Sequence, residues 1–112
     1  MLARNHHIRF LTSWSGGKDS ALAFLRARQS GAMPVGLLNM LAESGERSRS
    51  HGLPVAVLRA QAAALGLPMA FGQATWHDYE SVWVQQTRTL AQDLSASHVV
   101  FGDIDLQAHR DW

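Results

Sequence analysis

The sequence predicts an α/β fold in which a doubly wound parallel sheet carries helices on both faces. Two observations support this prediction. Apolar runs of strand length alternate along the chain with segments whose apolar residues recur at helical spacing. The run at residues 35–41, VGLLNML, is almost continuously apolar, which is typical of a parallel strand covered on both faces. Strands and helices that alternate at this spacing form βαβ units.

The first expected strand and the first expected helix are joined by a short turn that contains two glycines. Residues 8–12 have strand character, and apolar residues resume at helical spacing after the turn, at Leu22, Phe24 and Leu25. The turn itself reads Ser15-Gly16-Gly17-Lys18-Asp19-Ser20. A strand–turn–helix unit brings backbone N–H groups and the positive end of the helix dipole together, and this combination attracts phosphate.

The residue types of this turn suit phosphate binding. Gly16 and Gly17 allow positive φ and let a phosphate approach the main chain without a Cβ in the way. Ser15 and Ser20 can add hydroxyl donors, and Lys18 adds a mobile positive charge. The spacing does not match a Walker loop, GxxxxGK[ST]. An ordinary strand-to-helix turn with a serine cap is the alternative interpretation.

Four strands and three helices are expected in alternation. The helices are expected at residues 19–30, 54–65 and 78–96, and the strands at 8–12, 35–41, 69–75 and 98–104. Gly31 and Gly66 cap the first two helices, and Pro34 and Pro68 prevent their continuation. The apolar stripe of the second helix is Val55, Leu58, Ala62 and Leu65. That of the third helix is Tyr79, Val82, Trp83, Leu90 and Leu94.

Length and composition restrict the class of protein. The 112 residues are expected to form one domain, at 1–112, and 46% hydrophobic content is enough to bury a core. No apolar run approaches the roughly 18 residues of a transmembrane helix, and the apolar run after the basic N-terminus is too short for a signal peptide. A cytoplasmic protein is therefore expected. Cysteine is absent, which excludes disulfides and thiolate chemistry within these residues.

The charge pattern gives little support to nucleic-acid binding. The formal net charge is +1, with nine arginines and a single lysine, Lys18, and no basic block. The four tryptophans are not interleaved with basic residues, so they are expected in the core or at its rim rather than as a base-stacking platform. The six histidines show no metal-ligand spacing such as HxxxH, which disfavours a metal hydrolase.

Three polar loops are expected to share one site. In open parallel sheets ligands bind beyond the carboxyl ends of the strands, at a topological switch point. The loops that follow the first, second and fourth strands are residues 14–20, 43–52 and 102–110. Asp19 is a candidate magnesium ligand or simply a residue favoured at a helix start, and Asp103 is a site residue or a turn cap. Further candidates in these loops are Arg47, Arg49, His51, Asp105, His109 and Arg110.

The turn at residues 15–20 resembles the SGGxDS signature of the PP-loop ATP pyrophosphatases, which bind ATP and cleave it between the α and β phosphates. Three other segments resemble the diphthine–ammonia ligase-related branch of that superfamily: GERSRSHGLP at residues 45–54, WHDYE at 76–80 and GDIDLQAHRDW at 102–112. The similarity covers the chain from about Ile8 to its last residue. It implies a Rossmann-like fold of the adenine nucleotide alpha hydrolase type.

The resemblance also implies a chemistry. Family members amidate diphthine on elongation factor 2 by activating its carboxylate with ATP, using ammonium and releasing AMP and pyrophosphate. On this basis ATP and Mg²⁺ are the expected cofactors. The expected cofactor-binding residues are Ser15, Gly16, Gly17, Lys18, Asp19 and Ser20, the expected catalytic residues are Lys18, Asp19 and Asp103, and Asp19 is the expected metal ligand. GERSRSHG differs from the diphthamide enzymes' pattern, so the ATP chemistry transfers better than the acceptor.

Two alternatives to an amide-forming ligase remain open. They are a non-catalytic ATP-binding module of the same fold and a PP-loop enzyme that modifies tRNA, which the missing cysteines and weak positive charge disfavour. The expected partners are ATP, ammonium and a carboxylate acceptor, either a small molecule or a protein. Family members continue well beyond residue 112, so the chain is expected to lack an acceptor-binding region. An exposed fourth strand would then favour self-association.

Overall fold

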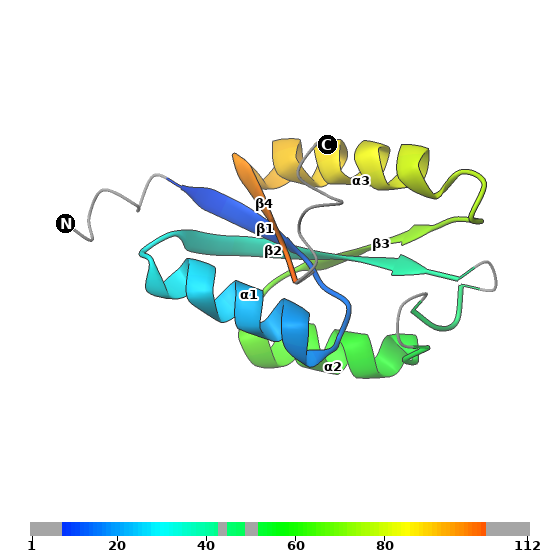
Figure 1. Ribbon diagram of the computed structural model, residues 1–112, viewed down its shortest axis with the longest axis horizontal. Helices are drawn as coiled ribbons and strands as arrows, with labels where there is room; N and C mark the ends of the chain where they lie inside the picture. The colour runs from blue at the N-terminus through cyan, green and yellow to red at the C-terminus, as the bar shows by residue number, and fades with distance from the viewer. Residues whose placement is uncertain (1–7, 43–44, 49–51, 103–112) are drawn as a thin grey trace.

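The computed structural model describes residues 8–42, 45–48 and 52–102. Strands and helices alternate through these residues, as the sequence predicts (Figure 1). The order is β1 (Arg9–Ser13), α1 (Lys18–Gln29), β2 (Met33–Leu41), α2 (Val55–Leu65), β3 (Met69–Gln73), α3 (Tyr79–Leu94) and β4 (His98–Phe101). The expected bounds are met within a few residues, and α3 ends at Leu94 rather than at Ala96.

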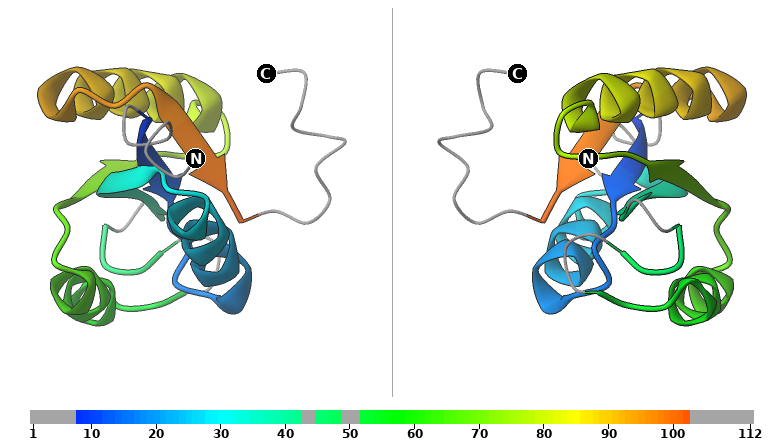
Figure 2. Two further views of the ribbon diagram at one scale, coloured as in Figure 1. Left: turned by 90° about the vertical axis from the view of Figure 1, so that its left-hand side faces the viewer. Right: turned by 90° about the vertical axis from the view of Figure 1, so that its right-hand side faces the viewer.

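The four strands form one parallel sheet in the order β3-β2-β1-β4. The chain therefore winds outward from β1 through β2 to β3 and then crosses to the other side of β1 to form β4. Helices α1 and α2 cover one face of the sheet and α3 covers the other (Figure 2). This arrangement is the doubly wound parallel α/β fold that the sequence predicts, with its change of winding direction between β1 and β4.

Strand β2 is buried on both faces. Every residue from Val35 to Leu41 is buried, because alternate side chains enter the cores on the two sides of the sheet. On the side of α1 and α2, the ring of Phe24 packs against Phe10 at 6.0 Å and against Trp14 at 6.0 Å. On the side of α3, Trp83 stacks on Phe101 at 5.4 Å between ring centroids.

Helix α1 packs on the sheet through a narrower face than the sequence suggests. Of its residues only Ser20 and Phe24 are buried, whereas Leu22 and Leu25 are 47% and 40% exposed. Successive residues of a helix are 100° apart, so Leu22 and Leu25 lie 160° and 100° around the helix from Phe24. The apolar spacing identified the helix correctly, but Leu22 and Leu25 do not belong to its buried face.

The other two helices bury the stripes that their sequences predict. Leu58 and Ala62 of α2 are buried, and Val55 and Leu65 pack beside them. Trp83 is the buried residue of α3, with Tyr79, Val82 and Leu90 packed around its cluster. Among the described residues, no helix has the length and apolar character needed to cross a membrane.

Candidate phosphate-binding site

The glycine-containing turn lies at the point where the winding of the sheet reverses. Residues 14–17 leave the carboxyl end of β1 and enter α1 at Lys18 (Figure 1). β1 pairs with β2 on one side and with β4 on the other. The three strands whose following loops were expected to share a site are therefore adjacent in the sheet, and the turn after β1 lies in the middle.

Two serines hold the turn in shape from within. The hydroxyl of Ser20 accepts the backbone N–H of Ser15 at 3.3 Å and donates to the carbonyl oxygen of Gly17 at 3.1 Å. The hydroxyl of Ser15 accepts the N–H of Gly17 at 3.2 Å and lies 3.2 Å from that of Ser20. Both hydroxyls therefore bond to the turn itself. Their role in this structure is to position its backbone.

Several backbone donors of the turn are left without an acceptor. Helix α1 is 12 residues long. Its N-cap residue is Gly17, so no N-cap side chain accepts a hydrogen bond from the first backbone N–H groups of the helix. The N–H groups of Gly16, Lys18, Asp19 and Ser20 have no hydrogen-bond partner among the described residues. They lie where the positive end of the helix dipole adds to their partial charges, so the turn has the donor set that a phosphate group requires.

The two glycines of the turn, Gly16 and Gly17, have different backbone conformations. Gly16 has φ of +89°, a conformation that residues with a side chain rarely adopt. A Cβ at Gly16 would also collide with the Leu53 side chain and lie 3.2 Å from Leu58 Cδ2. Gly17 is extended, with φ of −101° and ψ of −179°. The expectation that both glycines use their conformational freedom is met only at Gly16, because Gly17 already has the extended backbone of an N-cap.

The turn is anchored to two other elements by side chains that sequence reasoning did not single out. Buried Asn39 of β2 donates from Nδ2 to the carbonyl oxygen of Trp14 at 2.7 Å. The indole N–H of Trp14 donates to Oε1 of Gln61 at 2.8 Å, and Nε2 of Gln61 donates to the carbonyl oxygen of Gly16 at 3.4 Å. Gln61 occupies a position on the apolar stripe of α2, between Leu58 and Leu65. A glutamine on an otherwise apolar stripe is the sequence feature that could have identified this contact.

The described part of the loop after β2 folds back on itself beside α2. Ser48 forms an isolated antiparallel bridge with Leu41, and its buried hydroxyl accepts the N–H of Leu53 at 2.9 Å. The exposed guanidinium of Arg47 donates to the carbonyl oxygen of Gly52 at 2.8 Å. Arg47, a candidate for anion binding, therefore contacts the loop backbone in this structure.

The structure describes two of the three expected catalytic residues, Lys18 and Asp19. Lys18 is exposed and Asp19 half-buried in the first turn of α1. Asp103 lies outside the described residues, as do Arg49, His51, Asp105, His109 and Arg110. No cluster of three or more His, Asp or Glu suited to a metal occurs in the described ranges. A single carboxylate beside a phosphate site does fit Mg²⁺, which takes one or two carboxylates together with phosphate oxygens and waters.

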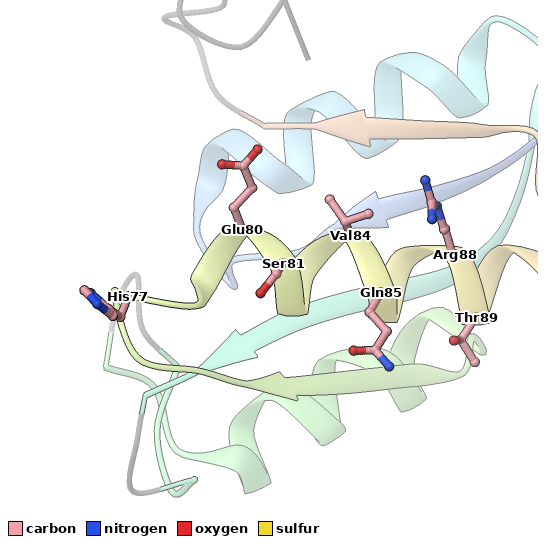
Figure 3. Close-up of a pocket in the computed structure, with 7 residues that line it drawn as sticks. All are labelled: His77, Glu80, Ser81, Val84, Gln85, Arg88 and Thr89. Carbon is pink, nitrogen blue, oxygen red and sulfur yellow. The ribbon is translucent and has the colours of Figure 1, made fainter.

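A hollow lies along α3, on the face of the sheet opposite to α1 (Figure 3). It is lined by His77 and by residues of α3 that include Glu80, Ser81 and Arg88. Figure 3 shows these side chains spread along the helix rather than converging on one point. Because the sheet separates this hollow from α1, the hollow does not belong to the candidate phosphate-binding site at residues 15–20.

Comparison with protein families gives a match that agrees with this architecture. The family model for the diphthamide synthase N-terminal domain matches residues 8–112. No curated protein matches the chain. The match covers nearly all of the sequence, so the chain belongs to the diphthamide synthase N-terminal domain family of the PP-loop superfamily.

Proposed function

We propose that this protein binds ATP at the turn of residues 15–20 and activates a carboxylate by adenylation, for amide formation with ammonia. The observation that carries the proposal is the set of unpaired backbone N–H groups at the start of α1, at the switch point of the sheet. The membership of the PP-loop superfamily supports ATP as the phosphate-containing ligand.

The residues of the turn have distinct roles in this proposal. The unpaired backbone N–H groups of Gly16, Lys18, Asp19 and Ser20 bind the β and γ phosphates. Lys18 neutralises the charge of the leaving pyrophosphate. Asp19 holds the magnesium ion, which supplies electrophilic assistance when it is bound together with ATP. Ser15 and Ser20 keep the turn in its binding conformation. Asp103 stays a candidate catalytic residue on the basis of its place in the sequence, two residues after the end of β4.

The acceptor carboxylate is the least constrained component. The family name associates the domain with diphthamide synthesis, and we propose an acceptor of that chemistry: a carboxylate on a protein or on a small molecule that becomes an amide. A cytoplasmic location, where ATP and ammonium are both available, is part of the same proposal.

The decisive measurements are binding and pyrophosphate release. Isothermal titration with MgATP and with inorganic pyrophosphate should show one site for each, and Gly17→Val should abolish both. Release of AMP and pyrophosphate with ammonium and an acceptor would establish the ligase reaction. Binding of ATP without pyrophosphate release would instead identify a non-catalytic nucleotide-binding module. Absence of binding by both ligands would overturn the proposal.

A further inference from the structure

We infer that Gln61 of α2 is a positioning residue for the phosphate-binding turn and determines the backbone conformation at Gly16. This inference rests on the proposed function, because it names what holds the proposed site in its binding geometry. Gln61 has no place in the turn's own sequence motif. It lies 45 residues further along the chain than Gly16.

The geometry places the Gln61 carboxamide between two parts of the turn. Its Oε1 accepts the indole N–H of Trp14 at 2.8 Å, and its Nε2 donates to the carbonyl oxygen of Gly16 at 3.4 Å. Trp14 is only 7% exposed, so its indole N–H depends on this acceptor for a hydrogen bond within the described residues. One side chain therefore bonds both to the residue before the turn and to the turn itself.

The hydrogen bond from Gln61 is made to Gly16, the residue of the turn whose backbone conformation is least favourable. Gly16 has φ of +89°, and the N–H groups that follow it point toward the proposed phosphate only if this peptide keeps its orientation. A bond to the Gly16 carbonyl oxygen restricts rotation of the peptide between Gly16 and Gly17. Leu53 and Leu58 occupy the space where a side chain of residue 16 would be, so the backbone at Gly16 lies directly against α2.

Asn39 provides a different kind of support. Its side chain bonds the carbonyl oxygen of Trp14 from β2, on the strand side of the turn, and makes no other hydrogen bond in the described part of the chain. Loss of Gln61 should therefore leave Trp14 in place and release Gly16. This difference separates positioning of the turn from general support of the fold.

Two variants of Gln61 test the inference. Gln61→Met keeps the length of the side chain and removes both hydrogen bonds. Gln61→Glu keeps the acceptor for Trp14 but loses the donor for Gly16 at neutral pH. Gln92→Met, on the exposed surface of α3, is the matched control. The readouts are the ¹⁵N–¹H shifts of the Trp14 indole and of the Gly16 and Gly17 amides without ligand, and the dissociation constants of MgATP and inorganic pyrophosphate.

Both Gln61 variants should shift the Gly16 and Gly17 amides and weaken pyrophosphate binding by about three- to tenfold, the effect of one hydrogen bond. The Trp14 indole N–H should move upfield in Gln61→Met, which removes its acceptor, and should stay at or downfield of the parent position in Gln61→Glu, where a carboxylate accepts. Unchanged glycine amides in a folded Gln61→Glu protein would overturn the inference. If the parent binds neither ligand while the amide shifts change as expected, the proposed function fails and the positioning role of Gln61 stands.

Discussion

Gly102 lies directly against the backbone of Ser20, so that the end of β4 contacts the first turn of α1. A Cβ at Gly102 would collide with the Cα and the backbone nitrogen of Ser20 and would lie 2.6 Å from the carbonyl carbon of Asp19. Backbone atoms cannot move aside as the end of a flexible side chain can. This contact brings the switch-point strand to the proposed phosphate site, and it explains why glycine occupies the residue after β4.

We therefore expect Gly102→Ala to reduce the free energy of unfolding by about 1–3 kcal/mol and to weaken ATP binding, because α1 must shift away from β4. Urea denaturation and ATP titration measure the two effects. Gly72→Ala in β3 is the matched control, since its Cβ would meet mainly the flexible thioether of Met40, 2.7 Å away at the sulfur. Equal effects of the two substitutions would show that the Gly102 contact has no special importance.

The two glycines of the turn should respond differently to substitution. Gly16→Ala places a side chain in the left-handed region and against Leu53, and should cost about 2 kcal/mol or more of unfolding free energy. Gly17→Val needs no unusual φ and should cost about 1 kcal/mol or less, while it places a branched side chain beside the proposed phosphate. Thermal unfolding and ATP titration distinguish the two. A Gly17→Val protein with parental ATP affinity would contradict the phosphate-binding assignment.

Asp19→Asn tests the proposed metal ligand. The substitution keeps the size of the side chain and removes its charge, so the Mg²⁺ concentration needed for half-maximal ATP binding should rise about tenfold, equivalent to roughly 1.4 kcal/mol. The fold should survive, as circular dichroism would show. Asp93→Asn, at an exposed site near the end of α3, is the control and should leave the titration unchanged. An unaltered titration for Asp19→Asn would remove Asp19 from the metal site.

The stability of the N-terminus of α3 should depend on pH through the carboxylate of Asp78. Its carboxylate accepts the hydroxyl and the backbone N–H of Thr75 at 2.9 and 2.8 Å, and these bonds lower its pKa below the ordinary 3.8. Because the pKa is lowered on folding, the stabilisation is present at neutral pH and is lost as pH falls below 3.8 through the folded pKa.

The substitution Thr75→Val removes the hydroxyl bond and should raise the pKa of Asp78 toward its ordinary value. An NMR titration of the Asp78 carboxyl carbon measures this change directly. Thr89→Val, further along α3, should leave the pKa of Asp78 where it is in the parent. A pKa of Asp78 that does not respond to Thr75→Val would assign the shift to other groups.

Ser95 ends α3 in a left-handed conformation, with φ of +56°, which is unfavourable for a residue with a side chain. Ser95→Gly removes a penalty of about 1–2 kcal/mol and adds about 0.5–1 kcal/mol of entropy cost, so a net gain of roughly 0.5–1 kcal/mol is expected. The melting temperature measures it. Ser30→Gly is the control: Ser30 ends α1 with φ of −73° and bonds the Ala27 carbonyl oxygen at 2.6 Å, so its replacement should destabilise the protein. A loss of stability in Ser95→Gly would contradict this account.

The sequence by itself was sufficient to predict the alternation of strands and helices and the turn between β1 and α1. Local properties explain this success. A continuous apolar run indicates a strand buried on both faces, and β2 is such a strand. Pro54 and Gly66 delimit α2 through their own backbone preferences, and Gly66 has the left-handed φ of +71° expected of a helix cap. The glycine turn is likewise recognisable from consecutive residues.

Only the tertiary structure decided which residues support the turn. The contacts of Gln61 with Trp14 and Gly16 join residues 47 and 45 positions apart, and they exist because α2 lies on the same face of the sheet as α1 and the turn that precedes it. The exposure of Leu22 has the same origin, since the apolar spacing of α1 does not specify which side meets the sheet. Contacts of this kind depend on how separate elements are oriented, and local sequence patterns carry no information about that orientation.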